Sequence, residues 1–418
     1  MLKNILLFLI AAFSMTQIRI VGYIGIAELA LLACGPFLLG KHWKALRRDG
    51  FAPFLVLAGL WASSAVVTDL HRENSTNNML KGVAAPLVMI FATPCLYLLL
   101  RDDVRRIKWA IVGFTVTLFL STYVMPSGFS VAMAAEQGIS AREAAEEYKL
   151  TYMSLVLSVV SLVPMLAYWQ VPTLSTLLTL GMAVFSLLQG GRSTFLGLLM
   201  SAAFLALIGG RLDRLKRLSR NMVALLVVLT LMGLGALLIY GAAVTHGYLG
   251  ETELRKYELQ KDSRIGLLSG RSHFVVAFYA WCDSPILGHG SWAIDYNGYE
   301  ERALDWVMPN QTIKAGSVSL GWIPTHSHIL GALVWHGLLG GIFWCYVLWL
   351  VERTVRYRLG VVPELFGYFA YTMPPMLWAI LFSPFGGRVA TITLLVVCLL
   401  ARNIDQCRRR ASAPARVT

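Results

Sequence analysis

The stretch that decides the fold contains Ser263-Arg-Ile-Gly-Leu-Leu-Ser-Gly-Arg-Ser-His273 and Ser284-Pro-Ile-Leu-Gly-His-Gly290, and leads into Pro324-Thr-His-Ser-His-Ile-Leu330. It runs from residue 245 to residue 325 and is the only long run in the chain that could not lie in lipid. An uninterrupted apolar segment lies on each side of it. The rest of the chain is therefore expected to be a membrane scaffold that presents this loop.

Composition predicts an all-α integral membrane protein. Of 418 residues, 57% are hydrophobic and 14% charged, and the apolar residues fall in blocks of about 17 to 25, as membrane-spanning helices require. The net charge of +13 does not indicate a nucleic-acid partner, because the basic residues cluster in short loops between apolar blocks. The six cysteines are scattered and only Cys282 lies in the long loop, so the loop is expected to hold neither a disulfide framework nor a cysteine metal site.

About twelve transmembrane helices are predicted. Residues 1–244 are expected to hold the first nine, residues 245–325 the large loop, residues 326–401 the last three, and residues 402–418 a basic tail. The blocks are 2–15, 18–39, 51–67, 83–100, 109–125, 150–169, 172–189, 193–209, 221–244, 326–350, 361–382 and 386–401.

The positive-inside rule orients these spans, because alternate loops carry clusters of Lys and Arg and the cytoplasmic loops of membrane proteins are enriched in both. Both termini are therefore predicted to be cytoplasmic and the long loop periplasmic. The basic residues of these loops and of the tail are Lys41, Lys44, Arg47, Arg48, Arg101, Arg105, Arg106, Lys108, Arg211, Arg214, Lys216, Arg217, Arg220, Arg353, Arg356, Arg358, Arg402 and Arg408 to Arg410.

Two outward loops are predicted to contain helices. Helical spacing of apolar residues over 254–281 predicts one or two helices in the long loop. In the loop 126–149, Ser140 followed by Glu143 forms a capping box, which predicts a short amphipathic helix on the membrane surface.

Arg192 stands where membrane orientation does not explain it. Gln189-Gly-Gly-Arg192 joins two apolar blocks with almost no loop, so the guanidinium lies at the membrane surface, where it is costly unless a partner pairs with it. The alternative is an arginine that reaches out to lipid phosphates. The two glycines permit close approach of a partner and favour a functional role.

Arg264 and Arg271 are seven residues apart, which places both on one face if the segment is helical. Such a pair can bind a pyrophosphate. The alternative is a surface helix that meets anionic lipid headgroups.

His326 follows Thr325, which is predicted to cap the helix that begins there. Near a helix N-terminus the imidazole is favoured as the neutral ring, able to accept a proton. His328 is expected to face away from it, so it is a secondary candidate and the two make no chelating pair. A lone histidine at this interface is as often a packing residue as a catalyst.

Arg388 and Lys81 lie at the same outward side and are further candidates for phosphate binding, or else headgroup anchors. No Asp-x-Asp or His-x-x-x-His pattern occurs on this side of the sequence, so the sequence predicts neither a metal nor another cofactor.

These features together resemble the O-antigen ligase and polymerase superfamily of bacterial envelope glycosyltransferases. The matching parts are Arg192 between two helices of the middle of the chain, Ser269-Gly-Arg271 before Pro285-Ile-Leu-Gly-His-Gly290, and His326-Ser-His-Ile-Leu330 before Gly337-Leu-Leu-Gly340. A histidine followed by asparagine is common at this place in the family, whereas Ser327 follows His326 here.

The resemblance implies a polytopic fold similar to that of GT-C glycosyltransferases. It also implies transfer of a glycan from undecaprenyl pyrophosphate to an acceptor at the periplasmic face of the inner membrane. The role of general base then belongs to His326, and Arg192 and Arg271 belong to the catalytic site. For an O-antigen ligase the acceptor is lipid A-core oligosaccharide, and membrane lipids surround the protein.

The residues themselves fit such a reaction. Guanidiniums can stabilise a pyrophosphate leaving group without a metal, a neutral histidine can deprotonate the acceptor hydroxyl, and direct displacement would invert the anomeric centre. A polymerase of the same superfamily stays open as an alternative, and a transporter or flippase is a third possibility from a different class. A transporter would be expected to show internal repeats and charged groups near the bilayer midplane, and only Glu28 lies deep in an apolar block.

Overall fold

The structure, a computed structural model, describes most of the chain. The described residues are 1–19, 23–120, 156, 158–188, 191–211, 213–214, 231, 235, 238–261, 263–264, 272–308, 321–383 and 388–412. The capping box at Ser140 and the candidate Arg271 lie outside these residues.

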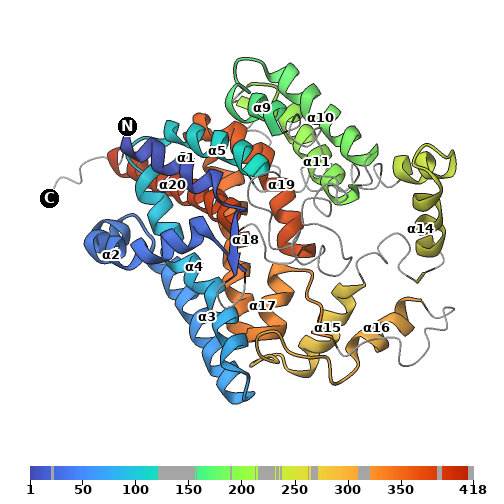
Figure 1. Cartoon of the computed structure of the whole chain (residues 1–418). Coiled ribbons are helices and arrows are strands. Elements are labelled where there is room, and N and C mark those ends of the chain that lie inside the picture. The colour runs from blue at the N-terminus through green and yellow to red at the C-terminus, as the bar shows by residue number, and fades with distance from the viewer. Residues whose placement is uncertain are drawn as a thin grey trace.

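The described part of the chain is built mainly of helices (Figure 1). A two-stranded antiparallel sheet, β1 with β2, follows the first helix. The named elements are α1 (Leu2–Ala12), β1 (Gln17–Arg19), β2 (Tyr23–Gly25), α2 (Ile26–Arg48), α3 (Ala52–His71), α4 (Thr76–Leu100), η1 (Val104–Arg106), α5 (Ile107–Phe119), α9 (Leu162–Leu166), α10 (Pro172–Leu188), α11 (Arg192–Ile208), α14 (Glu251–Lys261), α15 (His273–Asp283), α16 (Tyr299–Val307), α17 (His328–His336), α18 (Leu338–Tyr357), η4 (Leu359–Val361), η5 (Pro363–Leu365), α19 (Phe366–Phe382) and α20 (Arg388–Ser412).

Five segments of the described chain are long and apolar enough to cross a membrane. They lie in α3, α4, α18, α19 with the preceding η5, and α20, while α1, α10 and α11 are shorter apolar helices. These segments fit a helical membrane protein, as composition predicts. Twelve spans are not shown by the described residues.

The second predicted span, 18–39, has different limits in the structure. Its first residues form the β1–β2 hairpin, and α2 begins only at Ile26 and continues to Arg48, through the predicted loop at 41–48. Lysine and arginine are good helix formers, so the basic residues extend the helix. Hydropathy alone therefore predicts an end for this helix, at residue 39, that is earlier than its actual end at Arg48.

The predicted single span 326–350 is instead a pair of helices that meet at Gly337. A methyl group added at Gly340 would lie 2.8 Å from the carbonyl oxygen of Ala332, and the ring of His328 lies 4.8 Å from that of Trp344. His328 at the start of α17 therefore lies beside Trp344 of α18, and the two helices form an antiparallel hairpin. Gly337 forms the tip of this hairpin with φ of 69°, a conformation that glycine adopts without strain.

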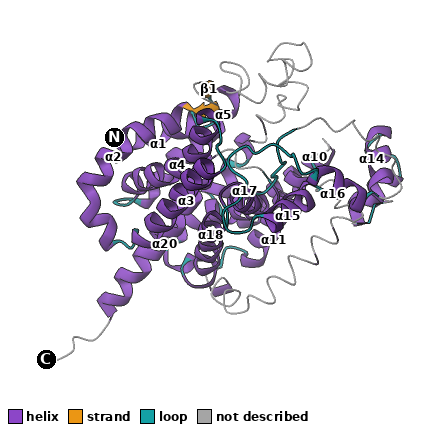
Figure 2. Ribbon diagram, turned by 90° about the horizontal axis from the view of Figure 1, so that it is seen from below, coloured by secondary structure: helices purple, strands orange, loops and turns teal. Residues whose placement is uncertain are grey.

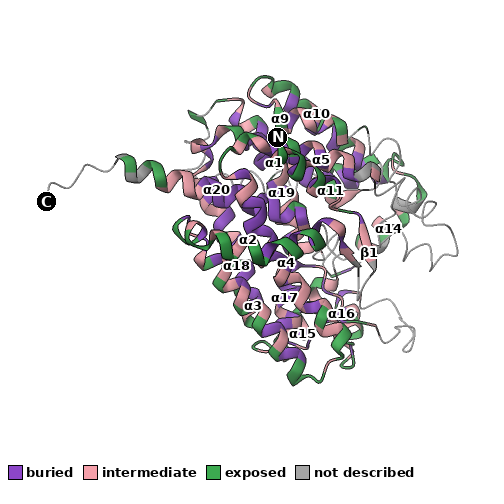
Figure 3. Ribbon diagram, turned by 60° about the vertical axis from the view of Figure 1, so that its left-hand side comes forward, coloured by how far each residue is buried: buried purple, intermediate pink, exposed green. Residues whose placement is uncertain are grey.

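The core of the bundle is formed by residues of α3, α4, α18, α19 and α20, and Figure 2 shows α3, α4, α18 and α20 grouped together. Its aromatic centre includes Trp61, whose ring lies 5.0 Å from that of Phe343, and Phe54, whose ring lies 5.6 Å from the same partner. Figure 3 shows this buried centre, with more exposed residues on the outer helices. The packing fixes α3 against the α17–α18 hairpin and so positions the loop described below.

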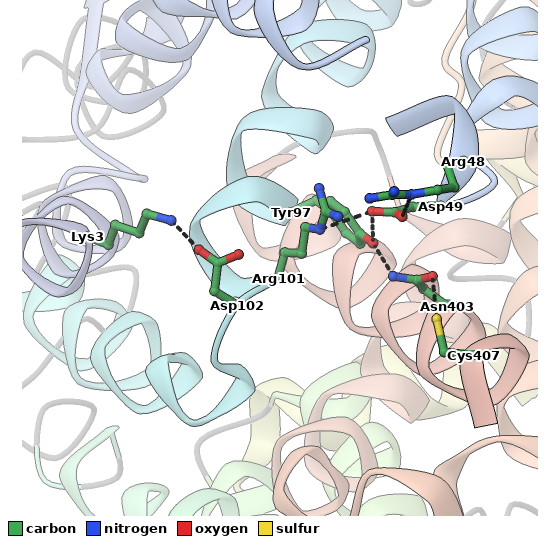
Figure 4. A network of polar contacts seen from close by, with 8 residues as sticks. All are labelled: Lys3, Arg48, Asp49, Tyr97, Arg101, Asp102, Asn403 and Cys407. Atoms are coloured by element: carbon green, nitrogen blue, oxygen red, sulfur yellow. Dashed lines mark hydrogen bonds and ion pairs between the residues drawn. The ribbon is translucent and has the colours of Figure 1, made fainter. Parts of the chain in front are cut away.

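A polar network joins several helix ends at one end of the bundle (Figure 4). We call this the basic end, because Lys3, Arg48 and Arg101 lie there. The Asp49 carboxylate accepts a hydrogen bond from the Tyr97 hydroxyl at 3.0 Å and pairs with Arg101 at 3.1 Å, and Asn403 donates to the Tyr97 oxygen at 2.8 Å. Nearby, a hydrogen bond from Lys3 lowers the pKa of the Asp102 carboxyl. The ends of α1, α2 and α4 and the charged part of α20 therefore meet at one end of the bundle.

Candidate functional site

The segment between α15 and α16 docks on the hairpin tip at the other end of α4. Helix α4 has 25 residues and is therefore about 37 Å long, so the docked segment and the basic end are a membrane thickness apart. The His289 N–H donates to the Val334 carbonyl at 2.7 Å, and the Leu338 N–H donates to the Ile286 carbonyl at 3.0 Å. The Ser284–Gly290 turn is thus part of the packed structure and not a spacer.

Glycine at position 337 is required by this docking, so Gly337→Ala is expected to destabilise the protein. An added Cβ would lie 1.9 Å from the Ile286 carbonyl oxygen, and the backbone conformation, with φ of 69° and ψ of −158°, by itself costs about 1–3 kcal/mol for an alanine. Thermal unfolding in detergent should show a loss of about 2 kcal/mol or more. The matched control is Gly59→Ala in α3, where nothing lies within 4 Å of the added Cβ; equal unfolding temperatures for the two variants would contradict the prediction.

A buried chain of hydrogen bonds anchors the end of the docked segment. The Asp69 carboxylate accepts the Ser291 N–H at 2.6 Å and its hydroxyl at 2.7 Å. The Ser291 oxygen lies 2.9 Å from Nε2 of His336, and Nδ1 of His336 accepts from the Trp61 indole at 2.8 Å. Asn74 donates to both Asp69 and the Ser291 carbonyl.

The sequence of donors and acceptors in this hydrogen-bond chain fits a structural anchor and does not fit an activated serine nucleophile. Because Nδ1 of His336 accepts a hydrogen bond, the ring proton is on Nε2 and points to Ser291, so the histidine does not accept the serine proton. The carboxylate of Asp69 contacts the serine, whereas in a catalytic triad it contacts the histidine. The sequence analysis did not single out these residues, because Asp69, Ser291 and His336 come from three distant segments and share no spacing.

Arg72 and Thr68 add a second set of contacts to the same segment. Arg72 donates to the Gly288 carbonyl at 2.9 Å and to the Ser284 hydroxyl at 2.8 Å, and Thr68 donates to the Leu287 carbonyl at 2.6 Å. The C-terminal end of α3 therefore holds the whole turn from Ser284 to Ser291.

His326 lies at the base of the hairpin and stacks on His273, the first residue of α15. The two ring centroids are 4.3 Å apart with an interplanar angle of 14°. The helix cap expected at Thr325 is wrong: Ser327 is the N-cap, since its hydroxyl accepts the Leu330 N–H at 3.1 Å. Serine has the better capping geometry here, so the helix begins two residues later and His326 precedes it.

His328 points into the core instead. Its side chain is only 3% exposed and packs on Trp344, whereas His326 is half-buried. The two histidines therefore have different surroundings, but helical spacing is not the reason, because His326 lies before the helix. His273 is the residue that sequence reasoning missed; its position two residues after Arg271 was the available signal.

Arg192 is the first residue of α11 and contacts α14. Its guanidinium donates to the Gln260 amide oxygen at 2.7 Å and lies 4.5 Å from the centroid of the Tyr240 ring. The glycine before it is also explained by local packing, since a Cβ at Gly191 would lie 2.8 Å from the Ser186 hydroxyl. Arg192 thus lies beside the helix that leads into the Ser263–His273 stretch.

Arg264 lies three residues beyond the end of α14. Its N–H donates to the Val307 carbonyl at the end of α16 at 2.9 Å, and its side chain is exposed. The shared face predicted for Arg264 and Arg271 stays a prediction, because 265–271 lies outside the described residues. The predicted helices of the long loop are confirmed as α14 and α15, and α16 is an additional one.

Arg388 contacts a carboxylate and Lys81 contacts an aromatic ring. Arg388 forms an ion pair with Glu28 at 3.1 Å, with the two side chains 19% and 7% exposed, and this pair joins α20 to α2. Such a burial is tolerated because the two charges pair. Lys81 lies 5.6 Å from the centroid of the Trp292 ring.

Trp292, the tryptophan that Lys81 contacts, packs against two other tryptophans. Trp292 has a positive φ of 58°, which costs about 1–2 kcal/mol for a residue with a side chain. Its ring stacks on Trp335 at 5.3 Å and meets Trp322 edge-on at 5.2 Å, and Trp322 is 55% exposed. The Ser291 anchor holds the strained residue in place, so the indole faces stay presented together.

Asp295 shapes the neighbouring helix α16. Its carboxylate accepts the N–H groups of Tyr299 at 2.9 Å and Glu300 at 2.8 Å. Burial raises the pKa of the Glu300 carboxyl, and the Asp295 charge raises it further. Within the described ranges, no three His, Cys, Asp or Glu side chains group as metal ligands would.

No protein-family model and no curated protein matches the chain. What the protein does therefore has to follow from the chemistry of these side chains.

Proposed function

We propose that this protein is an O-antigen ligase of lipopolysaccharide biosynthesis. In this proposal it transfers the O-antigen glycan from undecaprenyl pyrophosphate to lipid A-core oligosaccharide at the periplasmic face of the bacterial inner membrane. The transfer is metal-independent and inverts the anomeric centre. The observation that carries the proposal is the stacking of His273 on His326, which joins the start of α15 to the base of the hairpin.

The stack supports a shared site for the base and the leaving-group arginines. Arg271 precedes His273 by two residues, which span at most about 7 Å of chain. On the other side of the same stretch, Arg192 binds Gln260 of α14, four residues before Arg264. Arg264 and Arg271 thus belong to one continuous segment of the chain, which begins at the Arg192 contact with Gln260 and ends at His273, beside His326.

The chemistry needs both kinds of group. When the bond between the anomeric carbon and the phosphate oxygen breaks, one further negative charge develops on the departing undecaprenyl pyrophosphate, and guanidiniums stabilise it without a metal. A base must take the proton of the attacking hydroxyl. We assign this role to the imidazole of His326, which stacks on His273.

The placement of the site relative to the membrane follows from the basic residues. The network around Asp49 and Arg101 lies at one end of α4, and the His289 turn lies at the other end. If the basic end is cytoplasmic by the positive-inside rule, the site is periplasmic, where a lipid-linked donor and a lipid-anchored acceptor can meet. The tryptophans beside Lys81 offer flat apolar faces against which sugar rings can pack.

The two alternative functions, polymerase and transporter, are supported by the observed contacts to different degrees. A polymerase of the same superfamily would use the same groups on a carrier-linked acceptor, so the contacts fit it equally well. A transporter or flippase is less favoured, because Glu28, the one acid deep in a predicted span, is paired with Arg388 and is engaged in packing two helices.

The phenotype of a deletion strain tests the proposal. Loss of a ligase should leave polymerised glycan on undecaprenyl pyrophosphate and lipopolysaccharide without O-antigen. Both are measured by gel electrophoresis of lipopolysaccharide and by analysis of extracted carrier lipid. Lipopolysaccharide that carries single repeat units would instead indicate a polymerase, and unchanged lipopolysaccharide would refute both.

A further inference from the structure

A cavity of about 450 Å³ opens at the basic end of the bundle, far from the site above. It lies between the end of α18 and the charged part of α20. The residues that line it are Trp349, Arg353, Tyr357, Arg358, Asp405 and Gln406. None of them belongs to the proposed catalytic site.

Two arginines of this wall have buried N–H groups that no group of the described chain satisfies. Nε of Arg353 and Nη1 of Arg358 are both buried and have no hydrogen-bond partner among the described residues. The Glu352 carboxylate lies 3.7 Å from Nε of Arg353, beyond hydrogen-bond distance. An unsatisfied buried donor costs about 1–3 kcal/mol, so an acceptor in the cavity would be stabilising.

The charge around the cavity is also unbalanced toward the positive. Burial lowers the pKa of the Arg358 guanidinium, and the charge of Arg402 lowers it further, against the opposing effect of Asp405. Arg402 itself donates to the Gly50 carbonyl and the Tyr346 hydroxyl, and neither partner carries a negative charge. An anion is therefore the kind of ligand that this cavity would hold.

The position of the cavity indicates where that anion comes from. The apolar segments Leu338–Tyr357 and Arg388–Arg408 both end at its walls, so the cavity lies at the level of the lipid headgroups. Trp349 and Tyr357 are 41% and 46% exposed, and such residues are enriched at the membrane interface. Basic pockets between helices at this level bind the headgroups of anionic lipids.

We infer that this cavity binds the phosphodiester of an anionic membrane phospholipid. Arg353 and Arg358 donate their free N–H groups to the phosphate oxygens, and the rings of Trp349 and Tyr357 face the glycerol and the upper acyl chains. The volume holds a whole headgroup and not only a phosphate ion. This site does not depend on the proposed transferase activity.

Lipid binding by the full-length protein tests the inference. The purified, delipidated protein is titrated in detergent with phosphatidylglycerol or with phosphatidylcholine, and bound lipid is measured by native mass spectrometry. The wild type should retain phosphatidylglycerol preferentially, and the R353Q/R358Q variant should bind it at least about tenfold more weakly, since hydrogen bonds to charged groups are lost. The control R356Q should bind as the wild type does, because Arg356 pairs with Glu352 at 3.5 Å on the same helix and does not line the cavity.

A thermal measurement covers the case in which the double variant does not fold. Phosphatidylglycerol should raise the unfolding temperature of the wild type more than phosphatidylcholine does, and R353Q alone should reduce that difference. Equal effects of the two lipids on the wild type, or equal phosphatidylglycerol binding by R353Q/R358Q, would overturn the inference. If inorganic phosphate alone raised the unfolding temperature as much as phosphatidylglycerol, the occupant would be a soluble phosphate compound and the lipid assignment would be wrong.

Discussion

Replacing Arg192 by alanine is expected to reduce glycan transfer by about 10²–10³-fold, as loss of a preorganised donor to a developing charge does. The protein should stay folded and inserted, because Arg192 is the first residue of α11 and its contacts with Gln260 and Tyr240 lie at that helix end. Arg192→Lys should restore little activity, since an ammonium lacks the planar fork that binds two phosphate oxygens. The measurement is transfer from undecaprenyl pyrophosphate-linked glycan to lipid A-core by purified protein. The same loss is expected for Arg271→Ala.

Gln260→Leu separates catalysis from helix packing. This variant removes the hydrogen bond that ties Arg192 to α14 but keeps the guanidinium. It should retain most of the activity if Arg192 acts on the pyrophosphate. A loss as large as that of Arg192→Ala would mean that the arginine only positions α14. Full activity of an alanine variant at 192 or 271 would remove that arginine from the site, and Arg264 would then replace Arg271 as the candidate.

Replacing His326 by alanine is expected to lower transfer by about 10²–10⁴-fold, the range that a general base contributes, while donor binding persists. His328→Ala should be much milder per folded molecule, because His328 packs on Trp344 away from the His273 ring. Folded protein is quantified by its unfolding transition, since loss of a buried side chain at 328 costs stability. The measured quantities are the transfer rate and the affinity for undecaprenyl pyrophosphate.

The two measurements give His326 a definite role. A parallel fall in donor affinity and activity would make it a phosphate ligand. A normal rate in His326→Ala would show that the acceptor hydroxyl is activated in another way and that the arginines act alone by stabilising the leaving group. Equal sensitivity of positions 326 and 328 would point to packing as the common cause.

Much of the scaffold could be predicted from hydropathy. Helices α3, α4, α10, α11, α19 and α20 overlap the predicted blocks, because a long apolar run has few folded alternatives in lipid. The blocks at 18–39 and 326–350 were wrong in their limits or form. A window of hydropathy cannot detect a hairpin tip, and Gly337 reverses the chain inside an apolar run only because the Ile286 carbonyl packs against it.

The candidate site was predictable in part. His326 and His328 were expected to face different ways on one helix; they do have different surroundings, but because His326 lies before the helix. The neighbours of Arg388 and Lys81 do not follow from the sequence. Glu28 and Arg388 are 360 residues apart in the chain, and no local pattern links them. Arg388 was a candidate for phosphate binding because of its residue type and its expected side of the membrane. The fold places the Glu28 carboxylate against it.

The sequence by itself determined the long apolar helices that fit a membrane protein, the clusters of basic residues between alternate apolar blocks, and the polar loop with its arginines and histidines. These properties depend on amino-acid composition and on the order of residues along the chain. Each short segment therefore has them independently of its tertiary contacts. Only the tertiary structure decided that His273 stacks on His326, that Asp69, Ser291 and His336 form a buried anchor, and that Arg353 and Arg358 share a cavity wall. Each of these depends on packing between segments distant in the chain, and that packing is set by the joint fit of many side chains and not by any one segment.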